Sequence, residues 1–447
     1  MARFSILQNV SLILLINLVI IMLTNAIIIT THHPCSAFHA STEISNNLVC
    51  DNFTLTLAST DFGLTIHEKP LAVLEPTSIT EISELIKVSN SLSTPFTIAA
   101  RGQAHSVHGQ AMAREGIVVN MTHLNGYRHG KGVVIFRDEK DLWNSYADVG
   151  GEQVWSDVLN AALEYGLTPL SWTDNLFTSV GGTLVNAGVG GQTFKFGPQI
   201  ANVYELDVIT GKGDLKTCSA EKNSKLFYGV LGGLGQFGII TRARIALGPA
   251  YTKASIIFHY IILFAYIVVE RLVTGLKYVP TFKYEKDVLY QNFLHSSENP
   301  GGFPEGPQSW LDIFVPGSRI SDINEGVFKN IIFKQNLTAN GIILAFPMNR
   351  TKWNDKMSVA IPDEQVFYLV SVLQTVTYDT LKTFDDQKNQ ILEFCKDSGI
   401  GIKQYLPRNK THEEWIQHFG PKWQNFKDTK NKFDPKRILA PGQGIFN

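Results

Sequence analysis

The chain has 447 residues and a formal net charge of -1 at pH 7. This length exceeds what one hydrophobic core usually serves, so it predicts two cooperating lobes. Lys and Arg are scattered along the sequence, which argues against a nucleic-acid partner and favours a small, mostly uncharged ligand.

The N-terminus carries Arg3 and then an almost wholly apolar run over residues 11–29. This pattern predicts a secretory signal within residues 1–30. Cleavage is the favoured interpretation, and an uncleaved signal anchor stays open because about 20 apolar residues suffice to span a bilayer. Five sequons that follow the apolar run support export and are the expected glycosylation sites: Asn52, Asn120, Asn336, Asn349 and Asn409. We expect an extracellular protein, with the vacuole or the endoplasmic reticulum as alternatives.

The four cysteines, Cys35, Cys50, Cys218 and Cys395, are far apart and form no Cys-x-x-Cys pair. The spacing indicates neither a zinc site nor a redox pair. We therefore expect no metal site and a fold that does not rely on disulfides, with Cys35 in a linker.

The first half of the chain mixes helix and strand patterns. Ser78 and Glu81 have the spacing of a capping box before an apolar helical face, which predicts a helix over residues 78–90. Runs rich in β-branched residues predict strands at 96–100, 116–120 and 133–136, and a second amphipathic helix follows at 154–163. The predicted fold class is α+β.

Residues 233–238 match Gly-x-Gly-x-x-Gly, the dinucleotide-binding fingerprint. A Rossmann loop needs a strand before it and a helix after it. Here a helix-like stretch precedes the glycines and the β-branched residues 239–241 follow. The context therefore argues against a Rossmann site.

The segment 101–111, RGQAHSVHGQA, follows a predicted strand and contains a glycine turn. Such a turn can offer backbone N–H groups to a pyrophosphate and project a histidine at a cofactor. His108 lies three residues after His105, but no carboxylate cluster accompanies it, so we interpret it as a polar turn residue.

This segment resembles the flavin-histidine motif of the cytokinin dehydrogenase family, whose FAD domain is of the p-cresol methylhydroxylase type. Three further blocks occur in the family's order: residues 170–188, residues 231–241, and residues 439–446 preceded by residues 403–407. The resemblance covers about residues 74–249 and about residue 279 to the end. It implies an FAD-binding domain at 50–248, a substrate-binding domain at 249–404 and a C-terminal return to the FAD domain at 405–447.

The resemblance also implies site residues. His105 would carry FAD covalently, and Asp174 would accept a proton from the substrate amine or stabilise the developing cation. The positions that match the family's FAD contacts are Ala100, Gly102, Gln103, Ala104, Ser106, Gln110, Asp174, Ser179, Val185, Val189, Ile240, Tyr405, Ala440 and Gln443. The implied reaction oxidises N6-isoprenoid adenines to adenine and an aldehyde, and oxygen or a quinone-like acceptor reoxidises the flavin. The implied partners are the cytokinin and that acceptor, with no membrane partner unless an apolar run is retained, and we expect a monomer secreted to the apoplast.

Two departures from the family pattern matter. Ala104 replaces the usual glycine, and its methyl group would cost on the order of 1 kcal/mol if the position needs positive φ. The substrate domain is much shorter between residues 249 and 279, where an apolar run occupies 254–269. Three interpretations of this run stay open: a buried strand pair or helix, a membrane-associated segment, or an artefact of the gene model, which we favour.

Strand patterns resume at 310–316 and 341–349, and we expect Trp310, Leu311 and Phe314 in the core. Two alternative functions remain at this stage. One is a related covalent-flavin oxidase acting on another small molecule, and the other is a catalytically inactive flavoprotein with a shortened cap.

Overall fold

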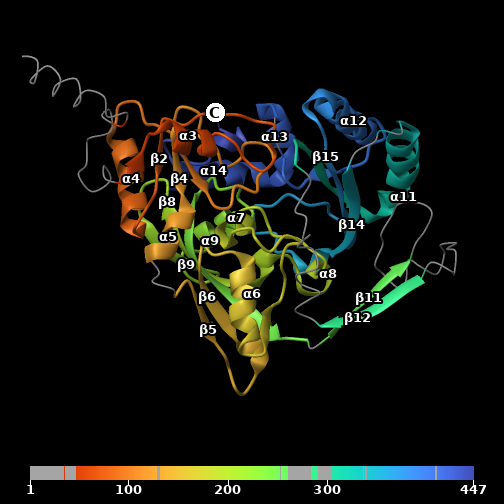
Figure 1. Cartoon of the computed structure of the whole chain (residues 1–447), viewed down its shortest axis with the longest axis horizontal. Helices are drawn as coiled ribbons and strands as arrows, with labels where there is room; N and C mark the ends of the chain where they lie inside the picture. The colour runs from red at the N-terminus through yellow and green to blue at the C-terminus, as the bar shows by residue number, and fades with distance from the viewer. Residues whose placement is uncertain are drawn as a thin grey trace, which may run out of the picture.

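The computed structural model describes residues 35, 47–127, 131–251, 253–259, 283–289, 305–335, 337, 340–407 and 410–446. Figure 1 shows two lobes side by side, with the orange-to-green first half of the chain in one and the teal and blue strands of residues 308–375 in the other. Both lobes combine helices with sheets, which confirms the α+β prediction.

The first sheet has the strand order β1-β2-β4-β3, in which β2, β4 and β3 run parallel. Its strands are β1 (Leu48–Val49), β2 (Ala72–Leu74), β3 (Ile98–Arg101) and β4 (Ile117–Asn120). Helices α3 (Asn52–Ala58) and α4 (Ile79–Ser91) pack against it, and α4 buries Ile82, Leu85 and Ile86 in the same core as the strands.

The start of α4 follows the local sequence signal. The Ser78 hydroxyl accepts a hydrogen bond from the Glu81 N–H at 3.3 Å. The Glu81 carboxylate reaches back to accept from the N–H of Thr77 at 2.9 Å, one residue earlier than in an ideal capping box. The predicted helix is confirmed.

The second sheet has the order β5-β6-β10-β8-β9, and β7 pairs with the far end of β10. Its strands are β5 (Val133–Phe136), β6 (Tyr146–Gly150), β7 (Leu167–Pro169), β8 (Val203–Thr210), β9 (Leu215–Ser219) and β10 (Gly238–Pro249). The helices of this part are α5 (Leu124–Tyr127), α6 (Trp155–Leu163), α7 (Val180–Leu184), α8 (Thr193–Phe196) and α9 (Ser224–Val230).

The order of α9, the glycine-rich loop and β10 decides the Gly-x-Gly-x-x-Gly question. Helix α9 precedes the loop and strand β10 begins at its last glycine, Gly238. No helix N-terminus follows to receive a phosphate, so the prediction that this is not a Rossmann loop is confirmed.

The second lobe contains a sheet of order β14-β15-β13-β16. Its strands are β13 (Gln308–Pro316), β14 (Asn340–Asn349), β15 (Val366–Thr375) and β16 (Lys403–Gln404), and its helices are α11 (Ile320–Asp322), the π-helix Ile323–Phe333 and α12 (Tyr378–Asp397). Leu311, Ile313 and Val315 of β13 pack with residues of α12, whereas Phe314 belongs to the core of the first lobe. The sheet therefore separates a helical layer from the rest of the molecule.

Strand β11 (Lys253–His259) pairs antiparallel with β12 (Lys283–Leu289), so the start of the apolar run 254–269 is a strand. Figure 1 shows this hairpin at the margin of the molecule. Residues 260–282 lie outside the described residues, so the membrane and gene-model interpretations remain predictions. Across the described ranges, no helix is both long and apolar enough to cross a bilayer.

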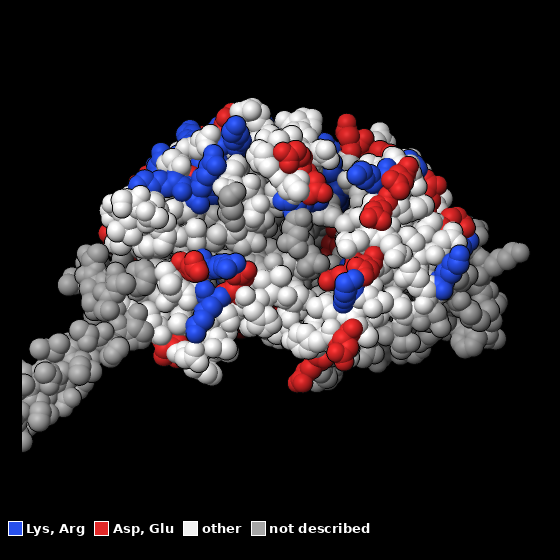
Figure 2. Space-filling view, turned by 90° about the horizontal axis from the view of Figure 1, so that it is seen from above, with Lys and Arg blue, Asp and Glu red and all other residues white. Residues whose placement is uncertain are grey.

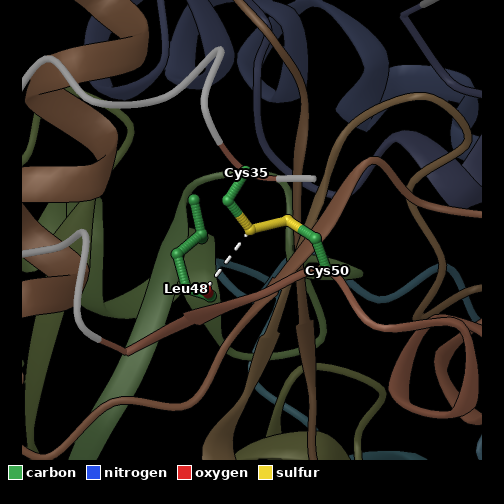
Figure 3. The surroundings of a disulfide bond; sticks show 3 residues. All are labelled: Cys35, Leu48 and Cys50. Carbon is green, nitrogen blue, oxygen red and sulfur yellow. Dashed lines mark hydrogen bonds between the residues drawn. A yellow bond between two sulfur atoms is a disulfide. The ribbon is translucent and has the colours of Figure 1, made fainter. Parts of the chain in front are cut away.

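Two of the four cysteines are paired and two are free. Cys35 and Cys50 form a disulfide with a Cα–Cα distance of 5.7 Å (Figure 3), whereas Cys218 and Cys395 are buried free thiols. The expectation of Cys35 in a plain linker is wrong, whereas a single disulfide in the described residues is not a framework on which the whole fold relies. Cys35 and Cys50 are both buried in the core of the first sheet. Sγ of Cys35 lies 3.3 Å from the carbonyl oxygen of Leu48. Sequence spacing alone does not reveal that approach.

The chain then returns to the first lobe through α13 (His412–Phe419) and α14 (Trp423–Phe433). The blue helices in Figure 1 lie next to the red and orange elements of the N-terminal part. After α14, the backbone runs beside β3. The Ile98 N–H donates to the Ile438 carbonyl at 2.7 Å, and the Ala440 N–H donates to the Ile98 carbonyl at 3.0 Å. The last residues of the chain thus lie beside the strand that leads into the candidate flavin turn.

Candidate functional site

The turn that follows β3 is built as the sequence motif requires. Ala104 has φ = 54°, in the left-handed region that favours glycine. The strain of about 1 kcal/mol expected for a methyl group at positive φ therefore applies at this position. Gly102 packs against Ser179, and a side chain at residue 102 would collide with the Ser179 hydroxyl. The turn therefore approaches the second sequence block closely at a position where only glycine fits.

His105 projects from this turn and contacts the second block directly. Its Nε2 lies 3.2 Å from Nδ2 of Asn175. Because Oδ1 of Asn175 accepts a hydrogen bond from the Phe177 N–H at 2.8 Å, the amide group is oriented with its NH2 toward the imidazole. Burial lowers the pKa of His105 to about 4, so the ring is neutral at physiological pH.

Two aromatic rings surround the imidazole. The ring of Phe62 lies 4.5 Å from that of His105, and the ring of Trp310 lies 5.9 Å away in an edge-on arrangement. Trp310 comes from β13 of the second lobe and is only half-buried. The expectation that Leu311 and Phe314 are core residues is confirmed, but Trp310 lies at the boundary of the lobes beside the candidate site.

Asp174 immediately precedes the asparagine that contacts His105. Its side chain is exposed, yet desolvation by the surrounding protein raises the pKa of its carboxyl to about 6. Exposure and desolvation are compatible for a carboxyl that reaches water from within a recess of the protein, because much of its surroundings is still low-dielectric. A carboxylate with this pKa is largely ionised at pH 7 and remains a competent proton acceptor.

The second and third sequence blocks are joined by backbone hydrogen bonds. The Leu234 N–H donates to the Val185 carbonyl at 2.8 Å, and the Gly232 N–H donates to the Leu184 carbonyl at 3.0 Å. Tyr405 joins the same region through its hydroxyl, which accepts from the Gly188 N–H at 3.1 Å. Burial raises the pKa of the Tyr405 phenol above its usual range, so it stays neutral.

The C-terminal block completes the convergence. Nε2 of Gln236 donates to the Ala440 carbonyl at 3.1 Å, and Ala440 itself has φ = 53°. Gly442 lies against the Gly109 carbonyl so closely that a side chain there would collide with it. Four blocks that are far apart in the sequence therefore meet around one turn.

Most predicted FAD-contact positions lie on these four blocks, but their exposure differs. Ser179, Val189, Ile240 and Gln443 are buried, and Ala100, Gln103 and Asp174 are exposed. The remaining positions, Gly102, Ala104, Ser106, Gln110, Val185, Tyr405 and Ala440, are half-buried. Their roles toward the cofactor remain predictions.

The residues present fit an FAD. Among the described residues, Oε1 of Gln443 is a buried acceptor without a hydrogen-bond partner, at the place where the C-terminal block meets the turn. The flavin motif also provides a glycine turn, a neutral histidine and a close backbone approach. The role of His108 as a turn residue agrees with its N–H, which donates to Oε1 of Gln110 at 2.9 Å.

Sequence reasoning missed four residues around the turn: Asp61, Phe62, Asn175 and Lys430. Asp61 accepts hydrogen bonds from the turn, and buried Lys430 donates to Oε1 of Gln236 at 2.7 Å and to the Leu439 carbonyl at 3.0 Å. A lysine four residues before an aspartate, Asp434, was visible in the sequence, but a surface pair is the usual meaning of that spacing.

A separate cavity of about 300 Å³ lies beside Trp172. Its walls include Trp143, Leu170, Phe196 and Tyr251, and none of the predicted FAD-contact positions lines it. This cavity is therefore separate from the candidate flavin site.

The glycosylation predictions are only partly covered by the described residues. Asn52 is exposed, whereas Asn120 and Asn349 are half-buried and accept hydrogen bonds from Thr122 and Thr351 of their own sequons. Asn336 and Asn409 lie outside the described residues.

Comparison with known proteins places the chain. Residues 70–219 match the FAD binding domain family, and residues 265–446 match "Cytokinin dehydrogenase 1, FAD and cytokinin binding". Cytokinin dehydrogenase 3 of Arabidopsis thaliana is 39% identical, over 100% of this chain and 99% of the relative. The chain belongs to the cytokinin dehydrogenase family.

Other members of the cytokinin dehydrogenase family are similar in extent. Cytokinin dehydrogenase 4 of Arabidopsis thaliana is 41% identical over 90% of this chain and 93% of its own length. Cytokinin dehydrogenase 10 of rice (Oryza sativa subsp. japonica) is 37% identical over 91% of this chain and 90% of its own length. The predicted family and the FAD cofactor are confirmed, and the protein is an FAD-dependent oxidoreductase.

The fold extends beyond the cytokinin dehydrogenase family. 6-Hydroxy-D-nicotine oxidase from Arthrobacter nicotinovorans superposes with a TM-score of 0.69 over 90% of this chain and 98% of that one, at 16% identity. The two proteins therefore share a fold, which agrees with the α+β class predicted from the sequence.

Proposed function

We infer that this protein is an FAD-dependent cytokinin dehydrogenase, which oxidises N6-isoprenoid adenines. The observation that carries this inference is the contact between Asn175 and His105, because it joins the histidine of the flavin motif to the loop that carries Asp174. Full-length similarity to the plant cytokinin dehydrogenases supports the same substrate class.

We further propose that FAD is attached covalently to His105. A bond would form between an imidazole nitrogen of His105 and a methyl carbon of the isoalloxazine, and each of the two would lose one proton. The two electrons released pass to the acceptor that the enzyme also uses in turnover. The lowered pKa of His105 favours this chemistry, because a neutral imidazole keeps a lone pair for the new bond.

In the proposed reaction, bound FAD would serve as the acceptor of a hydride from the substrate carbon beside the exocyclic amine, and the amine would give up a proton. Asp174 accepts that proton or stabilises the cation that forms. Water then hydrolyses the imine to adenine and an aldehyde, and oxygen or a quinone-like acceptor takes the two electrons from the reduced cofactor. The pKa of Asp174, about 6, suits a base at neutral pH.

The substrate-binding lobe is proposed to be shorter than in relatives. The alignment with cytokinin dehydrogenase 3 extends over 525 positions, whereas this chain has 447 residues. Sequencing of the transcript across residues 249–279 tests whether the difference arises from the gene model, because recovery of a longer open frame would replace the apolar run.

Secretion is proposed from the N-terminal signal together with the disulfide. A Cys35–Cys50 bond forms and persists in oxidising compartments, such as those of the secretory pathway. We propose a monomeric glycoprotein of the apoplast. N-terminal sequencing of the protein recovered from the medium of a plant cell culture distinguishes a cleaved signal from an anchor, since an anchored protein stays with the membranes.

The function is tested by turnover of isopentenyladenine with a quinone acceptor. We expect adenine and one equivalent of aldehyde, and an Asp174→Asn variant should be slower on the order of 100-fold or more. Purified protein that binds FAD yet forms no adenine would instead establish an inactive flavoprotein with a failed cap.

A further inference from the structure

A short segment, residues 61–65, lies along the turn that carries His105, and we call it the strap. Donor groups of the strap form hydrogen bonds with three carbonyl groups of the turn. The Phe62 N–H donates to the Ala104 carbonyl at 2.8 Å, the Gly63 N–H to the Ser106 carbonyl at 3.1 Å, and the Thr65 hydroxyl to the Val107 carbonyl at 3.0 Å. The shape of the turn therefore depends on a segment about 40 residues earlier in the chain.

Asp61 is the first residue of the strap, and its carboxylate binds the turn at several points. Its side chain is 4% exposed, and its carboxylate accepts from the Ser106 hydroxyl at 2.8 Å, the Gly109 N–H at 2.7 Å and the Gly63 N–H at 3.1 Å. Burial raises the pKa of Asp61, while these hydrogen bonds oppose the rise. All three partners are donors toward Asp61, which matches a carboxylate that only accepts.

Arg101, at the entry of the turn, closes the arrangement from the other side. Its guanidinium donates to the carbonyl groups of Thr60 at 2.6 Å and Leu57 at 3.0 Å. The first residue of the motif thus binds the chain before the strap, while Asp61 binds Ser106 and Gly109 further along the motif.

The strap also connects the turn to the second lobe. The Gly63 carbonyl accepts from the Gln308 N–H of β13 at 2.8 Å, and the Phe62 ring lies 5.4 Å from that of Trp310. A side chain at residue 63 would collide with the backbone of Val107. Residues 61–63 therefore both hold the turn and position the aromatic rings of Phe62 and Trp310 beside His105.

We propose that Asp61 is the positioning residue of the flavin turn, which it holds in the form that presents His105 to the cofactor. This proposal rests on the proposed attachment of FAD to His105. The hydrogen bonds of Asp61 are to Ser106, Gly109 and Gly63 of the strap, so it acts on His105 through these residues.

Replacement of Asp61 by Asn separates this role from simple packing. The asparagine side chain has nearly the same shape, but it offers one acceptor oxygen and an NH2 group in place of two acceptors. At least one of the donors at Gly63, Ser106 or Gly109 then faces an NH2 group and loses its bond. Loss of a hydrogen bond to a charged group changes the equilibrium between the native form of the turn and its other forms by about tenfold.

The experiment compares wild type, Asp61→Asn and Asp207→Asn after acid denaturation, with the flavin that stays on the chain measured by absorbance. Asp207 is a matched control because it also accepts several hydrogen bonds, from Thr217 and Arg242, but lies in the second sheet. We expect the acid-stable flavin of Asp61→Asn to fall about tenfold and that of Asp207→Asn to stay at the wild-type level.

Hydrogen–deuterium exchange supplies a readout that does not depend on the flavin. In Asp61→Asn we expect faster exchange of the amides of Gly63 and Gly109, with the amides of β8 unchanged. Thr65→Val, which removes one strap bond, provides a milder second variant that should shift both readouts in the same direction should Asp61→Asn fail to fold.

The outcomes are separable. Wild-type protein that loses all colour in acid overturns the attachment to His105 itself. Wild-type protein that keeps its flavin, together with an Asp61→Asn variant that keeps as much, overturns the positioning role alone. Equal loss in Asp207→Asn also overturns it, because the effect would then follow from general destabilisation.

Discussion

The NH2 group of Asn175 lies 3.2 Å from Nε2 of His105, and a hydrogen bond from Phe177 fixes its orientation. This contact links the candidate flavin histidine to the loop that carries the candidate catalytic carboxylate.

We predict that Asn175→Ala lowers kcat and the acid-stable flavin by about fivefold, because one hydrogen bond that orients the imidazole is lost. Steady-state kinetics and the absorbance of the acid-treated protein measure the two effects. Asn90→Ala is the matched control, since Asn90 also makes one partly buried hydrogen bond, to the Gly211 carbonyl. An Asn175→Ala variant with unchanged flavin content and kcat would contradict the orienting role.

A second prediction concerns the pH dependence of catalysis. The pKa of Asp174 is raised to about 6, and its ionised form is the proton acceptor, so kcat/KM should fall as the pH drops through about 6. The pH profile of wild type, measured from about pH 5 to about pH 8, tests this. Asp174→Asn should lose that inflection, and an inflection shared by both proteins would assign it to another group.

The raised pKa of Asp174 also makes the stability of the protein depend on pH. A folded state whose carboxyl has a raised pKa binds more protons than the unfolded chain between the two pKa values. The contribution of Asp174 is therefore fully present below the unfolded value of 3.8 and is lost as the pH rises through about 6. Thermal unfolding of wild type and Asp174→Asn over this window should show the variant gaining relative stability as the pH rises.

Ala104 provides a test of backbone strain. Because its φ is 54°, Ala104→Gly should raise the free energy of unfolding by about 1 kcal/mol. Ala161→Gly, in the last turn of α6, serves as the opposite control and should lower it by up to about 1 kcal/mol. Urea unfolding measures both, and a destabilised Ala104→Gly would show that the turn adopts another backbone conformation.

The disulfide predicts a defined thiol count. The denatured protein should show two free thiols, Cys218 and Cys395, before reduction and all four cysteines after it. The double variant Cys35→Ser, Cys50→Ser should lose up to about 3 kcal/mol of stability, as expected for a closed loop of about 15 residues. Four thiols before reduction would refute the bond, and Cys395→Ser calibrates the assay by removing one.

Local signals were sufficient for much of the fold. The cap of α4 was predictable because Ser78 and Glu81 are three residues apart, and the glycine-rich loop could be excluded as a Rossmann site from its immediate neighbours. The four blocks indicated an FAD site because of their order in the chain. Their convergence at one turn could be expected only through the resemblance.

What escaped prediction depends on contacts between distant residues. Asp61 meets Ser106 across 45 positions, and Asn175 meets His105 across 70. Neither residue has a spacing or a periodicity that marks it, and a lone Asp or Asn in a loop usually indicates only a turn. Cys35 likewise gave no signal, because its approach to Cys50 depends on how the segment packs on the first sheet.

The pairing of Ile98 with the backbone at Ile438 and Ala440 also bears on the order of events during biosynthesis. A ribosome makes the strand before the flavin turn long before it makes residues 438–440. The N-terminal lobe can begin to fold as soon as it emerges, but the edge of β3 is paired only after residues 438–440 have been synthesised. The region around the flavin turn is therefore completed by a segment that the ribosome delivers much later than the turn itself.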